Sequence, residues 1–259
     1  MQRRHFLTLG AIGSGMFALS RGGLGRAVAQ PAASVPTVDR LVMTNVVDNV
    51  YDIFAKAGRL DTITVERTPL SVQTPLLAEH GLAYHLESVR GSERKEILLD
   101  FSLTELNLFN NYRGLTLDPM RADALILSHG HRDHYGALPA LAAAGQGKFK
   151  LGMTVYAGGE DTFCRRMVMT PSGPADGGQL DAPALEARGL KVVLAKQPTV
   201  VAGHAFTSGQ IARVTDFETP PPSARLVAGP MDAACSAIHF GPTKVEAKPG
   251  DLVPDLFQG

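Results

Sequence analysis

The sequence has no tryptophan, and aromatic residues make up only 6% of its 259 positions. This scarcity argues against a protein that binds nucleic acid by stacking bases on aromatic rings. Basic and acidic side chains are balanced at 25 each, so no strong positive surface for nucleic acids or membranes is expected. No apolar stretch reaches about 18 residues, the length of a transmembrane helix. The length suits one large domain with a real core, or two small ones.

Cysteine is also scarce, since only Cys164 and Cys235 are present. The two could pair in an oxidising compartment, but two cysteines do not make a disulfide framework. Neither belongs to a CxxC motif or lies close to a histidine in the sequence. We interpret both as small, buried apolar residues.

The first 29 residues are predicted to be an export signal. A short basic start with Arg3 and Arg4 precedes a region rich in Gly, Ala and Leu, and residues 27–29 (Ala-Val-Ala) are typical of a cleavage site. The arginine pair resembles a twin-arginine signal, although Gln2 and Thr8 depart from the usual flanks. An ordinary Sec signal and a membrane-tethered N-terminus are the alternatives. We expect a periplasmic or secreted protein that uses the twin-arginine export machinery, with no stable membrane insertion after cleavage.

Short apolar runs alternate with helical patterns along the first part of the chain. Helices are predicted at 102–115, with Ser102 as N-cap, and at 137–147, where glycines end the pattern. The segment 170–184 is rich in Gly and Pro and is predicted to be a loop. The alternation of strands and helices predicts an α/β layered domain. The predicted strands are 40–52, 78–89, 95–101, 123–128, 150–157 and 190–195.

A dense group of candidate metal ligands follows one of these strands directly. The stretch ALILSHGHRDHYGAL, residues 124–138, contains His129, His131, Asp133 and His134. In an extended chain, residues two apart point to the same side, so His129 and His131 can chelate one ion. Asp133 and His134 come next and can face a second ion. Two such ions about 3.5–4 Å apart would hold a bridging hydroxide between them.

The alternative to a metal site is a solvent-exposed histidine-rich turn. The apolar strand before the cluster and the helix start after it, at residues 136–138, favour the metal site. Imidazole suits zinc, iron and manganese alike, and one carboxylate keeps the site on the harder side. We therefore predict two divalent cations as cofactors, zinc in the first place, with iron or manganese as alternatives.

The residues from Ser128 to His134 match an H-x-H-x-D-H signature, and Asp100 closes the apolar run before it. In these motifs the sequence resembles the metallo-β-lactamase fold superfamily. The segments VVDNVYD, LAEHGLAYHLE and FTSGQIARVTDFE are similar to one branch, the dihydropterin-ribofuranosyl-aminobenzene phosphate synthases and their relatives. The resemblance runs from about residue 40 to the end, and the histidine signature is its most specific motif.

The resemblance implies an α/β fold of the metallo-β-lactamase type, an αββα sandwich of which this chain would hold only the N-terminal part. It also implies that His129 and His131 bind the first metal and that Asp133 and His134 bind the second. Asp133 would be the catalytic residue that orients the metal-bound water. Asp100 would support the ligands from behind.

The later ligands that the resemblance implies are not found. After the cluster the only histidines are His204 and His239, and we interpret each as a surface or hydrogen-bonded residue rather than a ligand. The final segment, DLVPDLFQG, resembles the one that precedes the second half of the fold in this branch. We therefore expect a chain that is incomplete at its C-terminus. Its expected parts are a signal peptide (1–29), a linker (30–39) and a metallo-β-lactamase-like domain (40–259).

Other polar residues have simpler interpretations. His80 and His85 are expected to be structural or surface residues on a strand. Arg165 and Arg166 could meet an anionic substrate, but a solvated helix face is the preferred interpretation. No phosphate-binding GxxxxGK[ST] loop and no GxSxG or SxxK nucleophile motif occurs in the sequence.

Together these features predict an exported, metal-dependent hydrolase. It would use a metal-activated hydroxide to attack an ester, lactone, amide or phosphoester in a small-molecule substrate. One alternative is a transferase of the dihydropterin ribofuranosylaminobenzene phosphate synthase type, although export argues against a cytoplasmic cofactor-synthesis enzyme. The others are a true β-lactamase and an inactive fragment that binds metal weakly or not at all. Substrate, metal and oligomeric state are left open.

Overall fold

The computed structural model describes residues 34–68, 71–211, 217, 222–230, 235 and 247–255. The predicted signal peptide (1–29) and His239 lie outside these residues. In the part that is described, no helix reaches the length and apolarity needed to cross a membrane.

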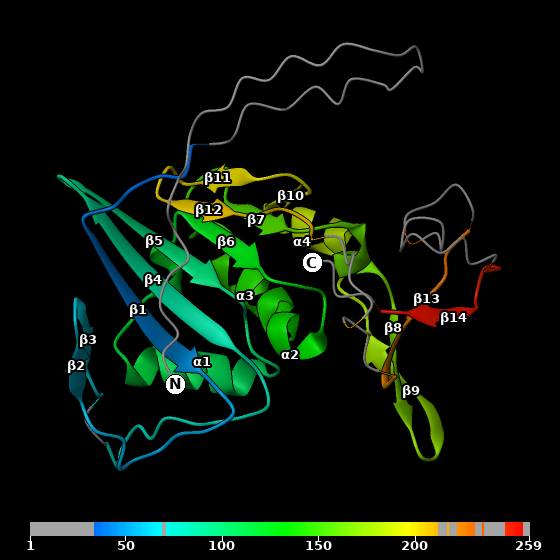
Figure 1. Cartoon of the computed structure of the whole chain (residues 1–259), viewed down its shortest axis with the longest axis horizontal. Helices are drawn as coiled ribbons and strands as arrows, with labels where there is room; N and C mark the ends of the chain where they lie inside the picture. Colours follow the sequence, from blue (N-terminus) through cyan, green and yellow to red (C-terminus); the bar gives the residue numbers. More distant parts are fainter. Residues whose placement is uncertain are drawn as a thin grey trace, which may run out of the picture. The chain divides into compact units, whose positions relative to one another are not determined.

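A six-stranded mixed sheet forms the centre of the fold (Figure 1). Its first three strands in spatial order pair antiparallel, and the later neighbours pair parallel. Each strand overlaps a segment predicted as a strand from its apolar residues, so this part of the prediction is confirmed. In spatial order the strands are β1 (Arg40–Val47), β4 (Ala83–Arg90), β5 (Glu93–Leu99), β6 (Ala124–Leu127), β7 (Thr154–Ala157) and β10 (Lys191–Leu194).

Helices cover one face of this sheet and enclose the main hydrophobic core. Leu125 and Leu127 of the central strand and Leu138 and Leu141 of the following helix are fully buried there. Burying each such side chain stabilises the fold by about 1.5–3 kcal/mol. The predicted α/β class is confirmed, and a helix-covered mixed sheet is the arrangement expected for one half of an αββα sandwich. The helices are α1 (Glu105–Gly114), α2 (Arg132–Tyr135), α3 (Leu138–Gly145) and α4 (Ala182–Glu186), with 3-10 turns η1 (Pro119–Arg121) and η2 (Glu160–Phe163).

Helix α1 begins later than its predicted cap. The N-cap is Thr104, whose Oγ1 accepts a hydrogen bond from the Asn107 backbone N–H at 3.3 Å, so the prediction of Ser102 is wrong. Ser102 has a positive φ of 63° and donates its hydroxyl to the Glu79 carboxylate. The same carboxylate also accepts the Thr104 hydroxyl at 2.7 Å. Glu79, which lies far from the helix in the sequence, therefore decides where α1 starts.

A smaller, four-stranded antiparallel sheet is formed by two strands that precede β10 in the sequence and two that follow it (Figure 1). The prediction of a loop over 170–184 is wrong, because a strand and α4 occupy most of that segment. This strand lies at the edge of the sheet, where Pro174 and several glycines are tolerated. In spatial order the strands are β14 (Leu252–Pro254), β13 (Ala224–Val227), β8 (Arg166–Thr170) and β9 (Gly173–Gly178).

A disulfide links two segments next to strands of this smaller sheet. Cys164, just before β8, is bonded to Cys235, which lies beyond β13, with their Cα atoms 5.6 Å apart. The interpretation of both residues as unpaired is wrong, because the pairing of β13 with β8 brings distant parts of the chain together. Cys164 is fully buried beside Leu226 and Val253, so the disulfide forms the centre of a second, small hydrophobic cluster.

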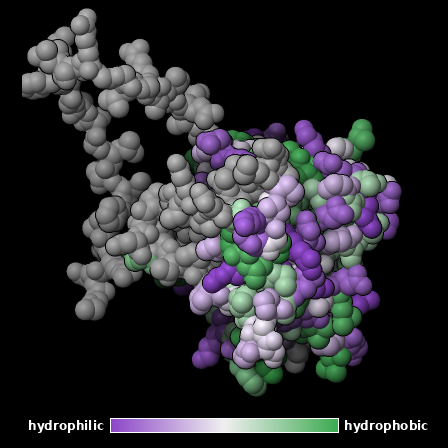
Figure 2. All heavy atoms as spheres, turned by 90° about the vertical axis from the view of Figure 1, so that its right-hand side faces the viewer, coloured by the Kyte–Doolittle hydropathy of each residue, from purple (hydrophilic) through white to green (hydrophobic). Residues whose placement is uncertain are grey.

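The surface on the side of the smaller sheet shows hydrophilic and hydrophobic residues interspersed (Figure 2). In the smaller sheet, Val168 and Leu252 leave 46% and 39% of their surface exposed.

Two further hairpins complete the described strands. They are β2 (Gly58–Leu60) with β3 (Ile63–Val65), and β11 (Thr199–Val201) with β12 (Ala205–Thr207).

Candidate metal centre

The predicted ligands follow strand β6 directly. The strand ends at Leu127, an extended loop carries His129 and His131, and α2 begins immediately after His131, which is its N-cap residue. Asp133 and His134 therefore lie on the first turn of a short helix. The buried strand fixes the start of the loop, and the helix turns the next two side chains back toward it.

The three histidine rings form one cluster. The ring centroid of His129 lies 4.6 Å from that of His131 and 4.1 Å from that of His134. Asp133 Oδ2 lies 3.5 Å from His134 Nε2. The structure thus brings together all four residues that the sequence singled out as ligands.

Asp100 anchors this cluster from the end of β5. One carboxylate oxygen accepts the Ser128 backbone N–H at 2.8 Å. The other accepts the Ser128 hydroxyl at 2.8 Å and lies 2.7 Å from His134 Nδ1. Asp100 is buried and has a positive φ of 60°, a conformation that aspartate tolerates better than most residues. The position behind the ligands that the resemblance implied for Asp100 is the one observed.

The backbone of α2 is held by two neighbouring loops. Leu82 N–H donates to the Asp133 carbonyl at 3.2 Å, and Phe101 N–H donates to the His134 carbonyl at 2.6 Å. A Cβ on Gly81 would lie only 2.8 Å from the same Asp133 carbonyl oxygen, so the close approach of this loop requires glycine. These contacts fix the helix that presents Asp133 and His134.

The structure adds two residues to the cluster that the sequence did not single out as site residues. Asp255, just after β14, is fully buried and lies with Oδ2 3.0 Å from His131 Nε2. The same oxygen accepts Arg166 Nε–H at 2.7 Å. Arg166 is 4% exposed at the start of β8, so its interpretation as part of a solvated helix face is wrong. No local pattern marks Asp255, because its partners are distant in the sequence.

Gly130 allows the histidine loop to lie close to η2 and the start of β8. A Cβ at this position would overlap the Thr162 carbonyl oxygen and lie 2.5 Å from Arg166 Nη1. Only glycine therefore allows the histidine loop to pack this closely against η2 and β8. The glycine of the H-x-H motif has a steric reason in this chain.

The cluster changes the proton affinity of its own rings. Burial, together with the neighbouring His134 and His131 rings, lowers the pKa of His129 to about 3. Burial also lowers the pKa of His134, but the hydrogen bond and charge of Asp100 and the charge of Asp133 outweigh it, so this pKa is raised. His129 is therefore neutral at physiological pH, which is the form of histidine that binds metal ions.

The donor set has the chemistry of a transition-metal site. Within the residues that the structure describes, no three His, Cys, Asp or Glu side chains are arranged to hold a metal ion as they stand. The three rings and the Asp133 carboxylate nevertheless lie together, and the ring of His129 is closer to that of His134 than to that of His131. Imidazole and carboxylate together suit zinc, iron or manganese, so the residues fit the cations that the sequence predicts.

Of the remaining described histidines, His204 and His85 lie away from this cluster, whereas His80 reaches its edge. His204 is buried, with Nδ1 3.1 Å from Ser88 Oγ and Nε2 3.3 Å from Glu93 Oε2, so its interpretation as a hydrogen-bonded residue is confirmed. His85 is buried within β4, as expected for a structural residue. The exposed His80 side chain precedes β4 and lies 3.4 Å from Asp133 Oδ2.

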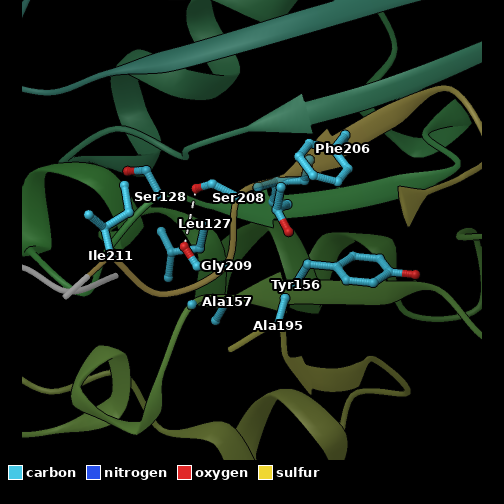
Figure 3. A pocket seen from close by; sticks show the side chains of 12 residues that line it. Leu127, Ser128, Tyr156, Ala157, Ala195, Phe206, Ser208, Gly209 and Ile211 are labelled. Atoms are coloured by element: carbon cyan, nitrogen blue, oxygen red, sulfur yellow. Dashed lines mark hydrogen bonds between the residues drawn. The ribbon is translucent and has the colours of Figure 1, made fainter. Parts of the chain in front are cut away.

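A pocket of about 330 Å³ opens beside Ser128, at the carboxyl ends of β6 and β7 (Figure 3). Leu127, Phe206 and Ile211 give it a largely apolar wall, and Tyr156 and Ser208 add hydroxyl groups. The Ser208 hydroxyl bonds to the Gly209 carbonyl at 3.1 Å. In open α/β sheets, ligands bind beyond the carboxyl ends of the strands, which is where this pocket lies.

The chain is similar to a curated protein over part of its length. No family model matches the chain. The chain is 31% identical over 84 residues to the 7,8-dihydropterin-6-methyl-4-(β-D-ribofuranosyl)-aminobenzene-5'-phosphate synthase of Methanocaldococcus jannaschii. This match covers 31% of the chain and 29% of the relative.

The similar solved structures are metallo-β-lactamase fold proteins, the superfamily that the sequence resembles. The metallo-β-lactamase SMB-1 bound to mercaptoacetic acid is 23% identical, with 50% of this chain and 46% of that chain covered and a TM-score of 0.30. YhfI of Bacillus subtilis is 15% identical, with 61% and 52% covered and a TM-score of 0.29. MIM-1 of Novosphingobium pentaromativorans is 15% identical, with 57% and 50% covered and a TM-score of 0.32. The chain spans about half the length of these structures.

Proposed function

We propose that this chain carries the metal-binding part of a metal-dependent hydrolase that is exported from the cytoplasm. The observation that carries the proposal is the cluster of His129, His131 and His134 with Asp133 at the end of a buried strand. Imidazole and carboxylate side chains gathered in this way are ligand types that first-row divalent cations bind in proteins.

The two pairs would divide the ligand role between them. His129 and His131 would hold one cation, and Asp133 and His134 the other. When bound, such cations polarise a carbonyl or phosphoryl oxygen and make water more acidic. Asp133 would accept a hydrogen bond from the attacking water and orient it, while Asp100 keeps the His134 ring in place through Nδ1.

The pocket beside Ser128 is the proposed substrate site. Its apolar wall would exclude water from one side of a small molecule, and its hydroxyl groups would orient polar atoms of the substrate. The substrate proposed is therefore a small molecule with an apolar portion and an ester, lactone, amide or phosphoester bond.

Metal binding is the first test of the proposal. The metal-free protein is titrated with Zn(II), Fe(II) and Mn(II) by calorimetry, in parallel with the variants His129→Gln and His204→Gln. We expect the wild type and His204→Gln to bind and His129→Gln to bind much more weakly, because His204 pairs with Ser88 and Glu93 on another part of the sheet. A wild type that binds none of the three metals would refute the proposed function.

The second candidate is a transferase of the dihydropterin-ribofuranosyl-aminobenzene phosphate synthase type, supported by the 31% identity over 84 residues. The two activities separate when the metal-loaded protein is given either nitrophenyl esters and phosphodiesters, or an aminobenzoate-ribosyl phosphate with a dihydropterin pyrophosphate. Hydrolysis in the first mixture favours the hydrolase. A coupled pterin product in the second favours the transferase, and metal binding without either product favours an inactive form.

Export is the remaining part of the proposal. The twin-arginine pair Arg3 and Arg4 supports it, and the Cys164–Cys235 disulfide is of a kind that forms and persists outside the reducing cytoplasm. We expect the expressed chain in the periplasmic fraction with a mature N-terminus near residue 30. Replacing both arginines by lysine should retain it in the cytoplasm, and unchanged export would count against the twin-arginine route.

A further inference from the structure

The contact between His131 and Asp255 joins the two sheets at the candidate metal centre. His131 belongs to the loop after β6, in the six-stranded sheet, and Asp255 follows β14, in the four-stranded sheet. Their closest atoms, Nε2 and Oδ2, are 3.0 Å apart. Asp255 is fully buried, so its carboxylate needs compensating partners within the protein.

Arg166 supplies the compensating charge. Its Nε–H donates to Asp255 Oδ2 at 2.7 Å, and its Nη1 donates to the carbonyl oxygens of Thr162 and Cys164 at 3.4 and 3.3 Å. These bonds hold the buried guanidinium through Nε and Nη1. The carboxylate is therefore fixed in place and turned toward the His131 ring.

This arrangement selects one form of the His131 ring. An ionised carboxylate can only accept hydrogen bonds, so Nε2 of His131 carries the hydrogen. A neutral imidazole with hydrogen on Nε2 presents its lone pair at Nδ1, the atom through which it would bind a cation.

The pair formed by His134 and Asp100 has the opposite polarity. Asp100 lies 2.7 Å from Nδ1 of His134, so the neutral form of this ring would present its lone pair at Nε2, the atom that lies 3.5 Å from Asp133. Two carboxylates from two sheets thus impose opposite tautomers on two rings of one cluster. Such partners of metal-binding histidines fix ring orientation and raise ligand basicity.

We propose that Asp255, held by Arg166, is a positioning residue that fixes His131 as the Nε2–H tautomer and directs Nδ1 to the cation. This inference rests on the proposed metal site for its function, but its structural part concerns the metal-free protein. It assigns a role at the centre to the four-stranded sheet, which contributes none of the four predicted ligands.

The tautomer is measured by two-bond ¹H–¹⁵N spectra of metal-free, ¹⁵N-histidine-labelled protein. In the wild type we expect His131 with hydrogen on Nε2. Asp255→Ala should give a mixture of tautomers, whereas Asp255→Asn should keep the wild-type form, because the amide oxygen still accepts. The control Asp176→Ala removes an exposed carboxylate of the same sheet that pairs with Arg165, and it should leave His131 unchanged.

A buried arginine without its carboxylate can prevent folding, so a second variant is needed. The double variant Arg166→Met with Asp255→Leu removes both charges and keeps an apolar interior. It should fold, as judged by its circular dichroism and thermal transition, and should lose the single tautomer. This variant separates the positioning role from a general loss of structure.

Zn(II) affinity, measured by competition with a chelating dye, gives the functional readout. Removal of a partner of this kind lowers metal affinity about 10–100-fold, and we expect this loss for Asp255→Ala and the double variant, with a smaller loss for Asp255→Asn. A wild-type His131 with hydrogen on Nδ1, or a tautomer that does not respond to Asp255, would overturn the inference even if Zn(II) binds. If the wild type binds no Zn(II) while the tautomer follows Asp255, the proposed function fails and the positioning role stands.

Discussion

Two carboxylate–imidazole contacts hold the histidine cluster, and they come from different sheets. Asp100 and His134 are 34 positions apart; Asp100 follows β5, and His134 lies in α2, shortly after the neighbouring strand β6. Asp255 and His131 are 124 positions apart, and the four-stranded sheet supplies the carboxylate. The first contact depends on one strand pairing and the second on the docking of a separate layer. The second should therefore be more sensitive to changes outside the cluster.

The largest expected effect comes from removing the disulfide, which tests whether the four-stranded sheet is the more sensitive part. The double variant Cys164→Ala with Cys235→Ala should lower the free energy of unfolding by about 2–4 kcal/mol, because the unfolded chain regains the freedom of a long loop. Urea denaturation measures the change, and hydrogen exchange locates it. We expect faster exchange in β13 and β14 than in β5 and β6. Uniform acceleration across both sheets would show that the four-stranded sheet is not the weaker partner.

The next effect breaks the junction between the sheets without touching a ligand. Gly130→Ala places a methyl group on the Thr162 carbonyl, so the histidine loop and η2 must separate. Overpacking against backbone should cost about 3 kcal/mol, measured by thermal or urea unfolding. Gly58→Ala is the matched control, since nothing lies within 4 Å of its added Cβ. Equal stability of the two variants would contradict the packing at Gly130.

The difference between the two contacts also explains what could be predicted from the sequence. The strands of the main sheet appear as apolar runs, and the four ligands appear through their spacing after one of them. Asp100 closes the apolar run before the cluster, and its supporting role was implied by the resemblance to the metallo-β-lactamase fold. In each case the pattern lies within a short stretch of the sequence. The pairing of neighbouring strands is enough to bring these residues together.

The contribution of the smaller sheet could not be predicted in this way. In the sequence, nothing distinguishes Arg166 from a surface arginine or Asp255 from other aspartates. Their contacts with the cluster depend on the pairing of β8, β13 and β14. Strand β9 was missed because its Gly and Pro residues are typical of loops, and its edge position is what tolerates them. The pairing of Cys164 depends on the same tertiary contacts, so the sequence alone favoured two unpaired residues.

The local contact can be tested separately with Asp100→Asn. Asparagine tolerates the positive φ at this position but removes the charge that Ser128 and His134 meet. We expect a loss of about 2 kcal/mol in unfolding free energy, typical of a hydrogen bond to a charged group. Asp181→Asn is the control, because asparagine caps a helix as well as aspartate does and α4 should be unaffected. If both substitutions lower the free energy of unfolding by the same small amount, the contact between Asp100 and the cluster does not stabilise the fold as proposed.

The smallest effect concerns a histidine that faces a carboxylate without belonging to the cluster. His85 Nε2 lies 3.3 Å from Glu96 Oε2 in the interior of β4. Burial lowers the pKa of His85, and the charges of Glu96 and Glu87 only partly oppose this. As the pH falls below about 6.5, the unfolded chain therefore takes up a proton that the folded chain resists, and stability is lost.

His85→Gln removes that proton uptake and should flatten the acid side of the stability profile. The measurement is the urea midpoint at pH 7.5 and 5.5 for the wild type and the variant, in metal-free buffer. We expect the midpoint of the wild type to fall more than that of His85→Gln. An equal fall in both would mean that other groups dominate this range. The expected difference would show that a carboxylate beside a buried histidine can be a structural feature of this sheet. What distinguishes the candidate metal centre is that three histidine rings meet there.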